Sequence, residues 1–270
     1  MTGNPQPKEH ADTIKTVESI PGAMRQMGWT VSADLMDRWL GSPAWVLPHE
    51  MKKHQPHHRY TPENTDQRIV RMAWAMTHPR LKINVDELRK KMANALAKEN
   101  LRERLLNSRW SAQREFAFGS RHDSAVDLED TCQSNSLPFG EKLGLLDDMQ
   151  GSLGVGSVKV ALIGEATRDV RAGRLTLKVT HAGFYIRDTY DFSGFQFLGA
   201  WTTDRVLSAT QMALNFPRRD MASRGTPVSA THVFNRDFEN YRRVTGYGGD
   251  FVVYSDVLWE SMNLSLEFTG

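Results

Sequence analysis

The sequence has only one cysteine, Cys132, in 270 residues. A disulfide within the chain is therefore excluded, and packing has to hold the fold, as expected for folding in a reducing cytoplasm. Long hydrophobic runs are absent too, and no stretch approaches the roughly 18 to 20 apolar residues of a membrane-spanning helix, so we expect no transmembrane segment. The polar N-terminus lacks the apolar region of a Sec-type signal peptide. We expect synthesis in the cytoplasm without a signal peptide, which leaves open secretion into target cells by a route that reads none.

An excess of charge of either sign is missing as well. Lys and Arg number 34 against 32 Asp and Glu, which gives a net charge of +2. Nucleic-acid-binding domains usually carry a clear basic excess, so we expect no nucleic-acid partner. One segment does mix basic and aromatic side chains as nucleic-acid surfaces do: Tyr241, Arg242, Arg243 and Tyr247. The near-neutral net charge favours a solvated helix face as its interpretation.

Common motifs of nucleotide binding and nucleophilic catalysis are also lacking. The sequence has no P-loop and no Gly-x-Ser-x-Gly elbow, and no signature near Cys132 names a partner base. Gly151, Gly154 and Gly156 precede a predicted strand, whereas a dinucleotide-binding fingerprint follows a strand and opens a helix. We therefore interpret these glycines as a turn.

Apolar residues at helical spacing dominate the first part of the chain. After a lead that we expect to be disordered, residues 1–13, a helical region is predicted over residues 14–110. Caps and prolines set the expected limits of its helices: Ser32 as an N-cap, residues 65–78 ended by Pro79, and a long helix from Asn84 to Leu105. Three tryptophans are expected in its core: Trp39, Trp45 and Trp74.

The pattern changes toward the C-terminus. Residues 111–150 predict a connector with one short helix, and residues 151–270 an antiparallel β domain. Its expected elements are a hairpin over residues 158–179 with a turn at Arg171 to Gly173, a short helix over residues 234–244, and a second hairpin from residues 251–259 and 264–268. The sequence therefore predicts an α+β fold with a helical N-terminal half and a mainly antiparallel β C-terminal half.

The segment from Gly183 to Trp201 gathers Asp188, Tyr190 and Asp191 at the end of an apolar β pattern. With a bend there, the two carboxylates could coordinate Mg²⁺ or polarise a water for attack on a phosphoryl group, with Tyr190 as a hydrogen-bond donor. Arg187 or Arg205 would neutralise the phosphate. The alternative is structural: Asp191 forms an Asx-turn, Asp188 pairs with an arginine, and Tyr190 belongs to the core.

A histidine-rich tract is the other candidate metal site. It contains His49, His54, His57 and His58. A zincin helix needs histidines four residues apart after His-Glu, but Lys occupies position 53 and Pro56 interrupts the segment. This spacing favours a solvated loop.

Several segments resemble one bacterial family of unknown function whose members are often encoded near type VI secretion components. They are IPGAMRQMGW, LMDRWLGSPAW, GFYIRDTYDF, LGAWTTDRVL and FNRDFENYRRVTGYGGDFVVYSDVLW, between Ile20 and Trp259. The resemblance implies a leaderless protein that is secreted as an effector against competing bacteria, or that accompanies the secretion tip. Its implied partners are a secretion-tip protein and a cognate immunity protein.

The run Asp188-x-Tyr190-Asp191-Phe192 after a hairpin is also similar to the activity domain of colicin M-type bacteriocins. That likeness implies metal-dependent hydrolysis of the peptidoglycan precursor lipid II. In that family an Asn and a His-Arg pair follow, whereas here Ser193 lies near the Asn position and SGFQFLGAW has no histidine or arginine. His232 or His181 would have to substitute.

These observations predict an interbacterial effector that hydrolyses a phosphorylated envelope precursor such as lipid II. The expected catalytic residues are Asp188, Tyr190, Asp191, Arg187 and His232, with Asp188 and Asp191 as ligands of Mg²⁺. The alternative is a non-catalytic adaptor or structural component of the secretion apparatus, which would use the helical half and exposed β edges for protein contacts.

Overall fold

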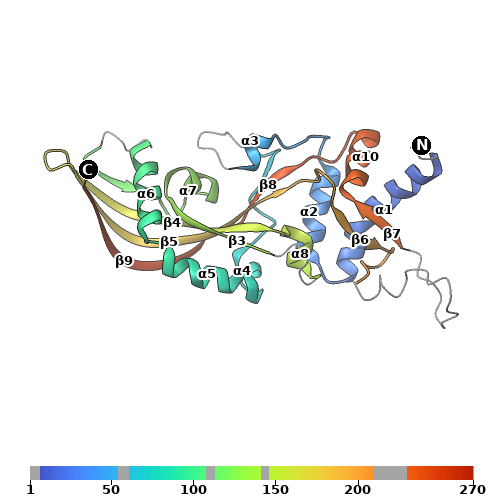
Figure 1. Ribbon diagram of the computed structural model, residues 1–270, viewed down its shortest axis with the longest axis horizontal. Coiled ribbons are helices and arrows are strands. Elements are labelled where there is room, and N and C mark those ends of the chain that lie inside the picture. Colours follow the sequence, from blue (N-terminus) through green and yellow to red (C-terminus); the bar gives the residue numbers. More distant parts are fainter. Residues whose placement is uncertain (1–6, 54–60, 108–112, 141–145, 209–229, 270) are drawn as a thin grey trace. The chain divides into compact units, whose positions relative to one another are not determined.

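The computed structural model describes residues 7–53, 61–107, 113–140, 146–208 and 230–269 (Figure 1). It confirms the predicted α+β class, with most helices in the N-terminal half and mainly antiparallel strand pairs. Two compact units are each assembled from separate stretches of chain. The first unit comprises Met1–His49, Leu143–Gly154 and Tyr190–Phe251, and the second comprises Glu50–Lys142, Val155–Thr189 and Val252–Gly270.

The domain limits predicted near residues 110 and 150 stay a prediction. The predicted disordered lead lies partly outside the described residues, and helix α1 begins within it at Pro7.

The first unit is built mainly from helices around an aromatic core. Its elements are α1 (Pro7–Gln26), α2 (Thr30–Gly41), α8 (Asp148–Leu153), β6 (Phe197–Trp201), β7 (Thr231–Phe234) and α10 (Asn235–Thr245). Trp39 of α2 is fully buried, with its ring centroid 5.0 Å from that of Phe192 and 5.3 Å from that of Phe238. Edge-to-face packing of this kind adds to the free energy gained by burying the rings. Trp39 is therefore a core residue, as predicted.

Helix α2 begins in a way that the sequence does not reveal. It starts at Thr30, so the prediction of Ser32 as its N-cap is wrong. Ser32 is buried inside the first turn, and its hydroxyl donates to the carbonyl oxygen of Asp148 at 2.7 Å. The Asp148 carboxylate in turn accepts from the N–H groups of Val31 at 3.2 Å and Ser32 at 2.8 Å. A distant carboxylate thus satisfies the free N–H groups of this helix end.

The second unit contains an antiparallel sheet with helices packed on it. Its helices are α3 (His49–Lys52, with His49 in the first unit), α4 (Met72–Ala75), α5 (Pro79–Lys91), α6 (Ala95–Asn107) and α7 (Ala125–Thr131). Its strands are β1 (Thr65–Asp66), β2 (Glu115–Phe118), β3 (Gln133–Phe139), β4 (Gly156–Asp169), β5 (Arg174–Tyr190), β8 (Phe251–Tyr254) and β9 (Leu258–Thr269). The sheet order is β1-β8-β5-β4-β2, β3 also pairs with β4, and β9 also pairs with β5 (Figure 1). The end residues Tyr190 of β5 and Phe251 of β8 belong to the first unit.

The predicted hairpin at residues 158–179 is confirmed and is longer than expected. Strands β4 and β5 pair from Ser157↔Arg187 to Asp169↔Arg174, and Gly173 lies in the turn with a φ of +59°. Alternation along the strands places Val160 and Phe184 on one face and Lys159 and Tyr185 on the other. The hairpin therefore forms the central pair of strands of the second unit.

The predicted helix over residues 65–78 is wrong in extent. Only Met72–Ala75 is helical, and Thr65 and Asp66 form the short strand β1, which pairs in parallel with β8. The Asp66 carboxylate accepts from the N–H of Arg68 at 2.9 Å and of Ile69 at 2.8 Å. This local turn competes with the helical pattern.

The predicted long helix from Asn84 to Leu105 is two helices. Pro79 begins α5 at its first turn, where a missing N–H is harmless, instead of ending a preceding helix. A break separates α5 from α6, and the Asn94 side chain accepts from the N–H of Ala97 at 2.8 Å as a cap. The Asn84 amide donates to the Arg80 carbonyl oxygen within α5. It is therefore not an N-cap.

The predicted connector over residues 111–150 is wrong in part, because β2, α7 and β3 lie in it. Helix α7 begins with a capping box of Ser124 and Asp127. The predicted second hairpin is also wrong, because β9 pairs with β5 from Arg174 to Phe184. Strand β8 pairs with β5 as well, and just beyond β8 the Ser255 N–H donates to the Ile186 carbonyl oxygen. The predicted helix near residues 234–244 is confirmed as α10, which ends at Gly246 with a φ of +74°.

Candidate functional site

The residues predicted to form a catalytic site are divided between the two units. Arg187 and Asp188 belong to the second unit, whereas Tyr190, Asp191 and His232 belong to the first. Among the described residues, no three His, Cys, Asp or Glu side chains group closely enough to hold a metal ion. The roles of Asp188 and Asp191 as metal ligands stay a prediction.

Tyr190 is part of the aromatic core of the first unit. Its side chain is 6% exposed and stacks on Phe251, with ring centroids 5.2 Å apart and an angle of 23° between the ring planes. Phe192 meets it edge-on at 5.4 Å, and the Tyr190 hydroxyl contacts the Met36 sulfur at 3.9 Å. This arrangement corresponds to the structural alternative for Tyr190.

Asp191 takes part in a local turn. The Ser193 hydroxyl donates to its carboxylate at 2.7 Å. Buried Asn235, at the start of α10, then fixes the turn, because its side-chain amide donates to the Ser193 carbonyl oxygen at 2.6 Å and its N–H donates to the Gln196 carbonyl oxygen at 3.0 Å. The Ser193 bond joins two side chains and is not the backbone N–H to carboxylate bond of an Asx-turn, so that alternative stays a prediction for Asp191. Together these bonds hold the following residues in a defined position.

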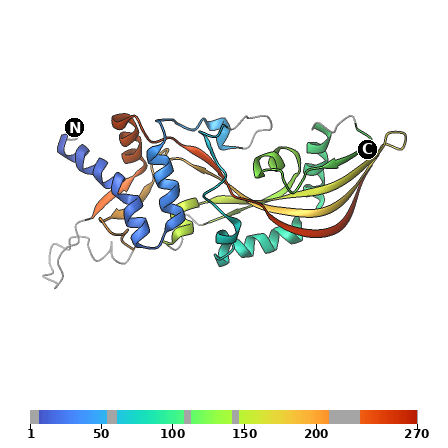
Figure 2. The same cartoon turned by 180° about the vertical axis from the view of Figure 1, so that it is seen from behind.

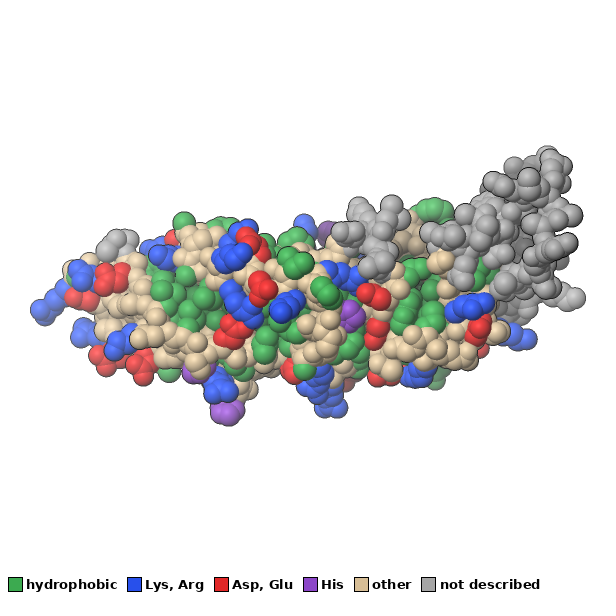
Figure 3. Space-filling model, turned by 90° about the horizontal axis from the view of Figure 1, so that it is seen from below, with side chains coloured by type: hydrophobic (Ala, Val, Ile, Leu, Met, Phe, Trp, Pro, Cys, Tyr) green, Lys and Arg blue, Asp and Glu red, His purple; other side chains and the backbone are tan. Residues whose placement is uncertain are grey.

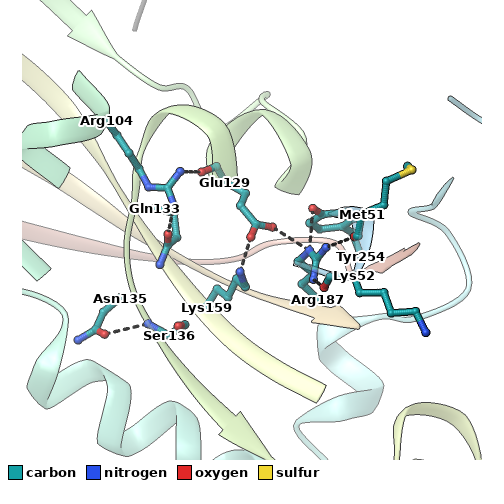
Figure 4. Close-up of polar contacts among 10 residues, drawn as sticks. All are labelled: Met51, Lys52, Arg104, Glu129, Gln133, Asn135, Ser136, Lys159, Arg187 and Tyr254. Carbon is teal, nitrogen blue, oxygen red and sulfur yellow. Dashed lines mark hydrogen bonds and ion pairs between the residues drawn. The ribbon is translucent and has the colours of Figure 1, made fainter. Parts of the chain in front are cut away.

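Arg187 is buried in the second unit. Its Nη1 donates to the Lys52 carbonyl oxygen at 3.0 Å, its Nη2 to that of Met51 at 2.9 Å, and its Nε to the Tyr254 hydroxyl at 3.2 Å (Figure 4). The guanidinium thus joins the end of β5 to α3 and β8. Every guanidinium nitrogen has a partner within the unit.

Arg187 also contacts a buried carboxylate that the sequence analysis did not identify. Glu129 of α7 is fully buried, and it forms ion pairs with Lys159 of β4 and with Arg187 (Figure 4). The Arg187 Nε lies 3.7 Å from the Glu129 Oε2. Arg104 of α6 donates to the Glu129 carbonyl oxygen and to the Gln133 side-chain oxygen. The only sign of this network in the sequence is that Lys159 and Arg187 each interrupt an apolar β pattern.

This buried network shifts the pKa values of its members. Burial lowers the pKa of the Lys159 ammonium, although the Glu129 carboxylate acts in the opposite direction. Burial raises the pKa of the neighbouring Tyr185 hydroxyl well above its usual range, and the Glu129 charge adds to this increase. The Tyr185 hydroxyl is buried without a hydrogen-bond partner among the described residues. Removing one member of such a network leaves an uncompensated charge, so its members depend on one another.

A second buried ion pair lies in the core of the first unit. The Asp250 carboxylate pairs with Arg242 of α10 and accepts from the Trp39 indole N–H at 2.9 Å and the Leu47 N–H at 3.0 Å. Burial raises the pKa of Asp250, against the effect of these donors. The predicted solvated helix face is therefore wrong for Arg242 and for buried Tyr241, whereas Arg243 and Tyr247 are exposed. Positive and negative side chains are interspersed over the face seen in Figure 3.

Exposed aromatic rings gather on the first unit, at the pairing of β6 with β7. Phe195 is 84% exposed and Phe197 41% exposed, and their ring centroids lie 5.7 Å and 5.2 Å from that of Phe234. His232 is exposed beside Phe197 at 5.9 Å, and the Arg236 guanidinium lies 4.9 Å from the Phe234 ring centroid. We call these five residues the aromatic platform. Large exposed apolar groups of this kind mark contact surfaces.

The sequence contained a weak signal for this platform. SGFQFLGAW lacks the histidine of the colicin M-type pattern, but it contains Phe195 and Phe197, which reach the surface. Strand alternation alone does not reveal which face of a two-stranded pair is solvated.

The remaining candidates are dispersed or buried. His49 is exposed at the start of α3, and His54, His57 and His58 lie outside the described residues. Cys132 is buried and takes no part in a disulfide, and the Thr131 hydroxyl donates to its sulfur at 3.3 Å. The predicted glycine turn is confirmed only for Gly154, which ends α8 with a φ of +52°, because Gly151 lies within α8 and Gly156 begins β4.

Comparisons with known proteins identify the family of the chain but no chemical activity. In the part of the chain that the structure describes, no helix combines the length and apolar character needed to cross a membrane. No curated protein and no solved structure matches the chain. One family model, described as a family of unknown function (DUF6402), matches residues 16–269. The chain therefore belongs to the DUF6402 family.

Proposed function

We propose that this protein works by binding another protein, as a non-catalytic adaptor or structural component of a secretion apparatus. The aromatic platform is the observation that carries the proposal, above all Phe195 with 84% of its side chain exposed. Exposing two phenylalanines to water sacrifices free energy that burial in the core would gain, at about 1.5–3 kcal/mol for each fully buried side chain. A binding partner that covers the two phenylalanines would recover this free energy.

The platform is also held in place before any partner binds. Asn235 ties the backbone on both sides of Phe195, through Ser193 and Gln196. The Phe234 N–H donates to the Asp237 carboxylate at 2.8 Å, which fixes the start of α10 beneath the rings. A surface that loses little conformational freedom on binding gives a higher affinity for the same contact area.

The polar members of the platform indicate the chemistry of the partner. Arg236 and His232 are exposed next to the rings. We infer that the partner presents apolar side chains beside a carboxylate, which would meet the guanidinium. Aromatic and arginine side chains at the centre of a contact are the usual sites of high binding energy.

The surroundings of the residues expected to be catalytic support a non-catalytic function. Tyr190 is in the core, Arg187 is in the Glu129 network, and Asp191 accepts from Ser193. The assignment to a secretion apparatus rests on the likeness of the segments between Ile20 and Trp259 to proteins encoded near type VI secretion components.

The test compares the platform with an unrelated exposed apolar residue. The tagged protein would be isolated from the bacterium that encodes it, and each co-purifying protein would be purified and titrated against wild type, Phe195→Ser/Phe197→Ser and the control Val170→Ser. Val170 is 65% exposed in the turn between β4 and β5 of the second unit. We expect the double variant to raise the Kd of the partner about tenfold or more and the control to leave it unchanged. An equal Kd for all three proteins would contradict the proposal.

A hydrolytic effector is the second candidate, and it rests on the likeness of Asp188 to Phe192 to colicin M-type enzymes. It proposes cleavage of a phosphorylated envelope precursor, with Asp188 and Asp191 holding Mg²⁺ and His232 or His181 as the missing histidine. Expression in the periplasm of a sensitive bacterium separates the two candidates. Growth arrest that is lost in Asp191→Asn and retained in Phe195→Ser/Phe197→Ser supports the hydrolase and contradicts the adaptor.

A further inference from the structure

Strand β9 of the second unit lies at the edge of the sheet. One side of it pairs with β5 from Leu258↔Phe184 to Thr269↔Arg174, and no other strand in the described part of the chain pairs with it. Figures 1 and 2 show β9 as the outermost strand from both sides. Its free side presents a row of backbone N–H and C=O groups that an added strand can bind.

The last part of β9 has a single feature of the kind that usually protects an edge, the exposed charge of Glu267. Residues 264–268 read LSLEF and contain no lysine, arginine or proline. Leu264 and Phe268 are only half-buried, although the residues opposite them in β5, Val179 and Leu175, are buried. Leu264 and Phe268 are therefore partly uncovered along the unpaired side of β9, where the side chains of an added strand would cover them.

This segment is complementary to itself in an antiparallel arrangement. When two copies of β9 pair with Leu266 at the centre, each Leu264 lies opposite the Phe268 of the other copy. Aromatic side chains opposite aliphatic ones stabilise cross-strand pairs. On the other face, each exposed Ser265 lies opposite the Glu267 of the other copy, so no like charges meet.

We propose that two copies of this chain associate through β9, by antiparallel pairing centred on Leu266. The pairing joins the two sheets of the second units into one continuous sheet and covers Leu264 and Phe268. The same surface patch serves both subunits, as a two-fold symmetric dimer requires. The proposal does not depend on the aromatic platform, which lies in the first unit.

Ser265 allows a test that separates the dimer from the fold. Within the chain it lies opposite Lys178, and Glu267 lies opposite Thr176. In Ser265→Glu the new carboxylate is therefore compatible with Lys178 of the same subunit. In the dimer, however, it lies opposite Glu267 of the other copy, and this repulsion occurs at both symmetry-related positions. Lysine at position 267 then removes the repulsion, so Ser265→Glu and Ser265→Glu/Glu267→Lys form a matched pair.

The full-length chain and these variants would be compared by sedimentation equilibrium over the micromolar range, with thermal unfolding as the control for the fold. We expect a wild-type dimer, a rise in Kd of roughly fivefold or more in Ser265→Glu, and restoration in Ser265→Glu/Glu267→Lys. A monomeric wild type would overturn the proposal. So would a dimer that Ser265→Glu leaves unchanged, or one that the double variant does not restore.

Discussion

Lys159 and Glu129 form an ion pair inside the second unit, which joins strand β4 to helix α7. Glu129 is fully buried and the Lys159 side chain is only 12% exposed. A charged pair so far from water is stable only while both members and their hydrogen bonds are present.

Lys159→Met should lower the free energy of unfolding by about 3–5 kcal/mol, because it leaves the Glu129 carboxylate without its nearest cation. Lys159→Met/Glu129→Leu should recover much of that loss, since the uncompensated charge is gone. Urea denaturation of both variants checks this. A double variant less stable than Lys159→Met would show that the carboxylate has another role.

Tyr185→Phe should keep or raise stability, by up to about 1 kcal/mol, because it removes a buried hydroxyl that has no hydrogen-bond partner among the described residues. Tyr254→Phe is the matched control. Its hydroxyl accepts from Arg187, and its loss should lower stability by about 1–2 kcal/mol. Thermal unfolding at neutral pH distinguishes the two, and equal losses would contradict the assignment.

Tyr185 should also make the protein sensitive to alkali. Its pKa is raised in the folded state, so the folded chain keeps the proton when the unfolded chain releases it near pH 10. This titration therefore leaves the free energy of unfolding unchanged below about pH 10 and lowers it as the pH rises further. Urea denaturation between neutral pH and pH 11 should show a shallower decline for Tyr185→Phe than for wild type. Parallel declines would count against a raised pKa.

The parts of the fold that the sequence predicts are those with local signals. The hairpin of β4 and β5 follows from alternation and a glycine turn, and α10 follows from its apolar spacing and Gly246. The core position of Tyr190 also follows from a local signal, because an aromatic residue in an apolar strand usually packs against other apolar side chains.

The parts that the sequence does not predict depend on distant partners. Ser32 looks like an N-cap, yet Asp148 satisfies the start of α2 from 116 residues away. Arg242 looks solvated, yet it pairs with buried Asp250. The sequence around Glu129 does not itself indicate a buried carboxylate, because the two strands that bring Lys159 and Arg187 to it are paired only in the folded sheet.

Arg242→Met should lower the free energy of unfolding by about 3–5 kcal/mol, because the Asp250 carboxylate would stay buried without a cation. Arg243→Met is the control on the same helix. It is exposed beside Asn240, and its removal should change stability by less than about 0.5 kcal/mol. Similar effects of the two substitutions on urea denaturation would contradict the buried pair.

Gly164→Ala should destabilise the protein strongly, by about 3 kcal/mol or more, because an added Cβ would lie 2.0 Å from the Lys178 carbonyl oxygen at the bulge between β4 and β5. Gly22→Ala in α1 has open space around it and should raise stability by about 0.5–1 kcal/mol. Thermal unfolding measures both. A tolerated Gly164→Ala would show that the bulge can relax.

The measurement that tests the proposed function most directly is photo-crosslinking in the cells that naturally produce the protein. A photoreactive phenylalanine analogue would replace Phe195 in one protein and Val170 in another. The binding proposal predicts that position 195 captures one partner protein that position 170 does not, and that Phe197→Ser raises the Kd of that purified partner. The same products from both positions, no product from position 195, or a Kd that Phe197→Ser leaves unchanged would contradict it.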